Sequence, residues 1–156
     1  MKTKQFLTLL VLMIVFFNSY GQKAMTFQEA EVRGRSFQHL DSLYKSAVDA
    51  DPKRAVFKTP QEQAELQKSY SALIQDLGVF LKANDFNWEK PTRCFNRIYF
   101  NPGGKIDYFL FNFPKDMIAA EKEKEFQRLL NVFIKDYKFP MKAKENFAQC
   151  SPVKYN

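Results

Sequence analysis

The stretch RIYFNPGGKIDYFLFNF, residues 97–113, determines how the C-terminal half of this chain folds. β-Branched and aromatic residues flank a short turn, which is typical of two strands joined as a hairpin. In NPGGK, Pro102 fixes one φ angle and the two glycines supply the backbone freedom that a tight turn requires. We therefore predict a strand over residues 94–101 and a return strand over residues 105–113.

The return strand has an irregular apolar pattern. Every second residue from Phe109 to Phe113 is Phe, as expected for one face of a strand, but Ile106 is three residues before Phe109. One extra residue in this strand would bring Ile106 onto the same face. We therefore predict a β-bulge near residues 107–108.

Two helices are predicted before the hairpin. Apolar residues recur at three- and four-residue steps over residues 26–50, although Gly34 weakens the helical pattern there. The second helix starts at TPQE, where Thr59 is a good N-cap and Glu62 completes a capping box, and it ends near residue 83. We predict that residues 26–83 form an antiparallel helical pair. Phe86 and Trp88 would then plug the junction with the hairpin, because Trp is usually highly buried.

A third helix and a last strand follow the hairpin. The predicted helix covers residues 117–136, with charged first turns and an apolar stripe later. Residues 145–155 have the composition of a strand, and Pro152 within them favours an edge position. The predicted fold class is α+β. A single domain over residues 22–156 would contain an N-terminal helical hairpin and then a ββαβ unit, residues 94–155, with a three-stranded antiparallel sheet.

This unit resembles the C-terminal domain of TonB, the periplasmic energy transducer of Gram-negative bacteria. The resembling segments are the hairpin IYFNPGGKIDYFLF, the helix ending LLNVFIKDYKF and the closing strand before SPVKY. The Pro-rich linker of TonB is replaced by the helical pair, so the resemblance implies a stand-alone periplasmic relative. It also implies pairing with an envelope or outer-membrane protein through a sheet edge. With the strands in the order second, first, third, the expected edge is Asn146, Phe147, Ala148 and Gln149.

The first 21 residues have the layout of a secretory signal. Lys2 and Lys4 precede the run FLTLLVLMIVFF, and Ser19 and Gly21 are small residues before a cut near Gly21–Gln22. The run has twelve residues, fewer than the roughly 20 that span a bilayer as a helix. Cleavage would leave a periplasmic or secreted protein, whereas an uncleaved segment would anchor it to the membrane.

Charge and composition exclude some functions. Without residues 1–21 the chain keeps 22 basic residues against 17 acidic ones, a net charge of +5. The basic residues are scattered and form no stripe with interleaved aromatics, so we expect no nucleic-acid partner. Two cysteines, Cys94 and Cys150, suggest a disulfide in an exported protein, because the predicted strand order brings them near one another. Two free thiols are the alternative.

The sequence contains no recognisable catalytic set. His39 is the single histidine, and there is no HExxH or CxxC motif, so we predict no metal, cofactor or catalytic residue. In the series Glu121, Glu123 and Glu125, successive residues are two apart, so neighbouring members would point to different sides of a helix. The sequence therefore favours an exported, non-enzymatic interaction module. The alternative is a small ligand-binding protein or hydrolase with its site between the helical pair and the sheet.

Overall fold

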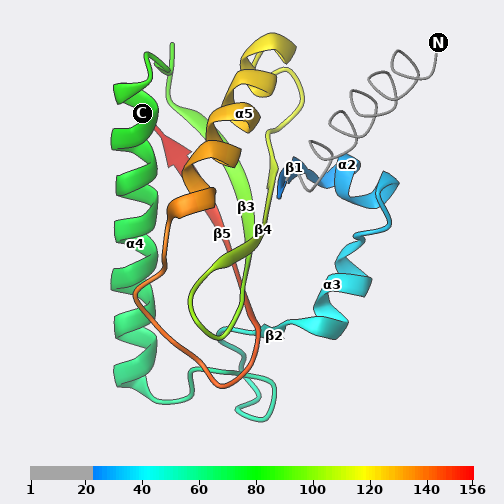
Figure 1. The fold of residues 1–156 in the computed structure, drawn as a ribbon, viewed down its shortest axis with the longest axis vertical. Coiled ribbons are helices and arrows are strands. Elements are labelled where there is room, and N and C mark those ends of the chain that lie inside the picture. The colour runs from blue at the N-terminus through cyan, green and yellow to red at the C-terminus, as the bar shows by residue number, and fades with distance from the viewer. Residues whose placement is uncertain (1–22) are drawn as a thin grey trace, which may run out of the picture.

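The computed structural model describes residues 23–156, which form an α+β fold around a five-stranded mixed sheet (Figure 1). The elements in chain order are β1 (Ala24–Thr26), α2 (Phe27–Val32), α3 (Phe37–Leu43), β2 (Lys45–Ser46), α4 (Pro60–Ala83), β3 (Thr92–Phe100), β4 (Ile106–Asn112), α5 (Ala120–Asp136) and β5 (Phe147–Tyr155). The predicted signal segment and its cleavage position lie outside the described residues. Within residues 23–156, no helix combines the length and apolar character needed to cross a membrane.

The prediction of a three-stranded antiparallel sheet is wrong. The sheet order is β1-β4-β3-β5-β2, so the predicted three strands form its centre and two short strands extend it. β1 pairs parallel with β4, and β2 pairs parallel with β5. These added strands have three and two residues, too few to show the two-residue alternation by which a strand is recognised.

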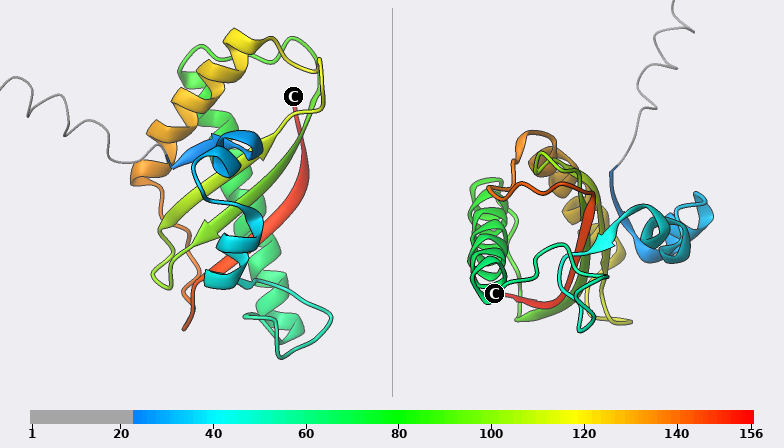
Figure 2. Two further views of the ribbon diagram at one scale, coloured as in Figure 1. Left: turned by 90° about the vertical axis from the view of Figure 1, so that its right-hand side faces the viewer. Right: turned by 90° about the horizontal axis from the view of Figure 1, so that it is seen from below.

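The predicted helical hairpin over residues 26–83 is also wrong. Residues 26–50 form two short helices because Gly34 adopts a left-handed φ of +68° after α2, and Ser36 caps α3 by accepting from the backbone N–H of His39. α4 matches its prediction, including the capping box between Thr59 and Glu62. The two regions do not pack as a pair. α4 lies on one face of the sheet, and α2 and α3 lie on the other (Figure 2).

The hairpin and its bulge are confirmed. Phe100 pairs with Ile106 and Tyr99 pairs with Tyr108, so Asp107 is the extra residue of β4. The turn between β3 and β4 closes through a hydrogen bond from the N–H of Gly104 to the carbonyl of Asn101, at 3.0 Å.

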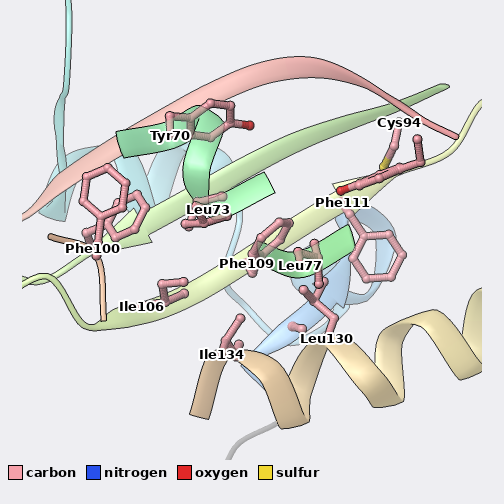
Figure 3. Packing of buried hydrophobic residues seen from close by; sticks show 14 of the residues in the cluster. Tyr70, Leu73, Leu77, Cys94, Phe100, Ile106, Phe109, Phe111, Leu130 and Ile134 are labelled. Carbon is pink, nitrogen blue, oxygen red and sulfur yellow. The ribbon is translucent and has the colours of Figure 1, made fainter. Parts of the chain in front are cut away.

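The main core lies between the sheet and the helices α4 and α5, on what we call the core face (Figure 3). Phe and Leu side chains from the strands and both helices fill this space, and Phe109, Phe111 and Phe126 are fully buried. Trp88 is partly buried and stacks on Tyr155 with ring centroids 4.9 Å apart, but the helical pair whose junction it was predicted to plug does not form. The filled interface counts against a ligand or catalytic site between helices and sheet.

A smaller core lies on the opposite side of the sheet, which we call the outer face. α2 and α3 cover β1, β4 and part of β3 there. Leu40 of α3 is buried there against Met25, Tyr99 and Leu110 of the sheet. The two helices have only six and seven residues, so they leave part of the outer face uncovered.

Candidate functional site: an open strip on the outer face of the sheet

The candidate site is the part of the outer face that α2 and α3 border but do not cover, with Phe95 touching Phe27 of α2 and Arg97 bonded to Asp41 of α3. The half of β5 that leads to the C-terminus runs clear of both helices in the left panel of Figure 2. Six side chains occupy this area, which we call the open strip: Arg93, Phe95 and Arg97 from β3, and Cys150, Pro152 and Lys154 from β5. Strand register places them in three directly opposed pairs, which are Arg93 with Lys154, Phe95 with Pro152, and Arg97 with Cys150.

One end of the open strip forms a shallow hollow with mostly apolar walls, which we call the apolar hollow. It has a volume of about 350 Å³, and its lining includes Phe95, Pro114, Pro152, Arg93 and Lys154. Phe95 is 38% exposed, whereas Phe100 at the end of the same strand is fully buried. The hollow therefore presents apolar surface with two cations beside it.

These two cations have no acidic partner in the described part of the chain. Among residues 23–156, neither Arg93 nor Lys154 forms an ion pair or a side-chain hydrogen bond. Directly opposed side chains on antiparallel strands have Cβ atoms roughly 4.5–5.5 Å apart, and like charges there destabilise the sheet. Folding alone gives no reason to place this pair here.

A second hollow, lined mostly by charged side chains, lies at the other end of the open strip, and we call it the polar hollow. It has a volume of about 510 Å³, and its lining includes Asp41, Asp49, Arg54, Arg97 and Cys150. Its arginines are paired, unlike the cations of the apolar hollow. Arg54 Nη2 lies 3.0 Å from Asp49 Oδ1, and Arg97 Nη2 lies 2.5 Å from Asp41 Oδ1.

Arg97 joins α3 to the sheet. Its Nε donates to the Tyr99 hydroxyl at 2.8 Å, and its guanidinium lies 5.3 Å from the ring centre of Phe37. Burial disfavours the charge of Arg97, but the hydrogen bond to Asp41 and the nearby Tyr99 and Asp41 groups outweigh it, so its pKa is raised. Arg97 is therefore a permanent cation that positions α3 and supports the open strip.

The structure does not contain the predicted disulfide. Both cysteines are free, and Cys94 lies on the core face while Cys150 lies on the outer face. Cys94 pairs with Val153, so Cys150 is offset by three residues, and an odd offset places a side chain on the other side of a sheet. Burial raises the pKa of the Cys94 thiol to about 12, so it stays protonated.

The predicted binding edge is mostly occupied. β2 pairs with Phe147 and Ala148, and the carbonyls of Asn146 and Ala148 accept from β2 and the residue after it at 3.0 and 2.8 Å. These residues are not an open edge because β2, a strand that the sequence did not predict, pairs with them.

The rest of β5 does form an edge, but its own side chains protect it. Backbone groups alternate along a strand, so Cys150, Pro152 and Lys154 direct theirs outward. Pro152 has no N–H to donate, and its carbonyl accepts from Ser151 Oγ at 3.0 Å. The Cys150 carbonyl accepts from Gln149 Nε2 at 3.3 Å. Proteins use such features to discourage strand addition.

The remaining candidate residues form no site in the described part of the chain. His39 is exposed on α3, and Glu121, Glu123 and Glu125 lie on α5. Within residues 23–156 no group of three or more His, Cys, Asp or Glu side chains could hold a metal. The predicted lack of catalytic residues and cofactors stays a prediction.

Comparison with known proteins gives no match: no protein-family model, no curated protein and no solved structure is similar to this chain. The resemblance of residues 94–155 to the TonB domain therefore stays a prediction. The sequence prediction missed the open strip, although TRCFNRIYF alternates outward Arg93, Phe95 and Arg97 with inward residues. That alternation is a usable signal, but the facing strand and its register were needed to complete the site.

Proposed function

We propose that this protein is an exported, non-enzymatic interaction module that binds an envelope protein through the open strip. The observation that carries this proposal is the unpaired, directly opposed Arg93 and Lys154 beside the apolar hollow. An acidic residue at one of these two positions would have paired with the remaining cation and stabilised the sheet. A binding surface explains why two cations and an exposed Phe95 are held together instead.

The face of the sheet suits this role better than its edge. β3 is hydrogen-bonded on both sides, to β4 and to β5, so the side chains of the open strip are held on a rigid support. The edge beyond β2 is blunted by Pro152 and by the Gln149 and Ser151 side chains. From the TonB resemblance we carry over only the expected location of the partner, in the cell envelope.

Site-specific photocrosslinking tests the proposal. A benzoylphenylalanine residue placed at Phe95 in cells that naturally make the protein is expected to crosslink one or a few discrete envelope proteins. The same residue at Val79, which is 71% exposed on α4, is the matched control and is expected to give none of these products. Identical products from both positions, or none from Phe95 in folded protein, would overturn the proposal.

A further inference from the structure

We propose that the open strip binds an acidic segment of a polypeptide, with an apolar side chain in the apolar hollow and an adjacent carboxylate between Arg93 and Lys154. This inference rests on the proposed function and names the chemistry of its partner. The opposed pair Phe95 and Pro152 forms an apolar subsite, and the neighbouring opposed pair Arg93 and Lys154 forms a cationic subsite.

The apolar subsite is large enough to admit a side chain. Its volume of about 350 Å³ is near the lower end of the range for small-molecule pockets, roughly 300–1,000 Å³. Phe95 and Pro152 oppose one another across the strands, and Pro114 adds a third apolar surface. One Phe, Leu or Met side chain fits inside the hollow and would remove part of this apolar surface from water.

The cationic subsite suits a carboxylate. Arg93 and Lys154 repel one another in the free protein, and an anion between them would change that repulsion into two charge-assisted hydrogen bonds. The third cation of the open strip differs, because Arg97 already holds Asp41. Within the described residues, the cations of the open strip that form no ion pair are therefore Arg93 and Lys154, beside the apolar hollow.

The geometry favours a peptide over a membrane surface. Membrane-binding aromatics project from a surface, whereas Phe95 lines a hollow, and its ring packs edge-on against Phe27 with centroids 6.0 Å apart. A concave site with a cation pair beside it suits one inserted side chain and one localised negative charge.

Three peptide probes test the inference with ¹⁵N-labelled protein corresponding to residues 22–156. The first is acetyl-Gly-Phe-Asp-Gly-amide, the second replaces its Asp by Asn, and the third replaces its Phe by Ala. We expect the first to shift the amide signals of Arg93, Phe95 and Lys154, and the other two to bind about tenfold more weakly or not at all. Equal binding of the Asp and Asn peptides would overturn the inference.

Two charge-removing variants provide an independent readout. Arg93→Gln and Lys154→Gln are each expected to weaken binding of the Asp peptide about tenfold and to raise Tm, because each removes one member of the repelling pair. Lys68→Gln, at an exposed position of α4, is the matched control and is expected to change neither. Unchanged peptide affinity in both strand variants would also overturn the inference.

The outcomes separate this inference from the proposed function. Crosslinking from Phe95 to a discrete protein, with no discrimination between Asp and Asn peptides, would refute the acidic partner and leave the interaction module in place. Phe95-dependent binding to phosphatidylglycerol vesicles, without peptide binding or protein crosslinks, would overturn both.

Discussion

Tyr44 donates a hydrogen bond from its hydroxyl to Asp107 Oδ2 at 2.9 Å, which ties the end of α3 to the bulge of β4. The bulge places an extra residue in β4, and this residue is the acceptor. The two residues are 63 positions apart in the chain. The irregularity in the strand therefore serves the packing of α3 on the outer face.

Replacing Tyr44 by Phe is expected to lower the free energy of unfolding by about 1–2 kcal/mol, because Asp107 would lose its partner in a half-buried position. Tyr108→Phe is the matched control, since the Tyr108 hydroxyl forms no hydrogen bond within residues 23–156. Urea unfolding monitored by circular dichroism gives both values. Equal losses in the two variants would mean that the bond to Asp107 adds no stability.

Stability is expected to fall as pH rises above about 10. Burial raises the pKa of Tyr70 and Tyr99 to about 12, and the pKa of Tyr155 also lies well above its ordinary value of 10.0. The folded state thus holds protons that the unfolded chain loses first. The resulting stability is complete below the unfolded pKa and is lost as pH rises through the folded values.

Tyr70→Phe tests this pH dependence at one residue. Within residues 23–156 the buried Tyr70 hydroxyl makes no hydrogen bond of ordinary geometry, although Ser151 and Asn96 lie near enough to moderate its raised pKa, so its removal is expected to leave stability near pH 8 unchanged or slightly higher. The decline above pH 10 should become shallower, because one raised pKa has been removed. Urea midpoints measured from pH 8 to pH 12 would show this, and a variant with the same slope as the unmodified protein would contradict it.

The two thiols are expected to react differently with iodoacetamide. Cys150 is exposed and should alkylate in the native protein, whereas Cys94 is 3% exposed with a pKa of about 12 and should react only after unfolding. Mass spectrometry should therefore show one adduct on native protein and two in urea, both without reductant. Unfolded, unreduced protein with no reactive thiol would instead indicate the disulfide.

Two glycines should respond to alanine in opposite directions. A Cβ added at Gly104 would lie 2.3 Å from the Phe139 carbonyl oxygen, and its φ is +83°. Gly104→Ala is therefore expected to lower the free energy of unfolding by more than about 2 kcal/mol. Gly78 lies within α4 with open space around it, so Gly78→Ala should raise that free energy by about 0.5–1 kcal/mol. Urea unfolding decides both, and a stable Gly104→Ala protein would contradict the close approach.

Local chemistry explains which parts of the fold were predictable. The capping box at Thr59, the NPGGK turn and the bulge each depend on a few neighbouring residues, and all three predictions are confirmed. β1 and β2 could not be predicted in this way, because strands of three and two residues exist only through partners far along the chain. Their absence from the prediction also produced the incorrect edge at Asn146–Gln149.

The site depends on register, which is harder to predict than the elements themselves. Cys94 and Cys150 were placed in adjacent strands correctly, but a three-residue offset puts them on opposite faces. The same register creates the opposed Arg93 and Lys154 pair. A shift of one residue in β5 would have changed both conclusions.

Both outer strands of the sheet come from residues 24–46, and this has a consequence for the order of folding. Ala24 pairs with Phe109, and Lys45 pairs with Phe147, so each outer strand completes the sheet only by contacting a strand far along the chain. Contacts this distant in sequence slow folding.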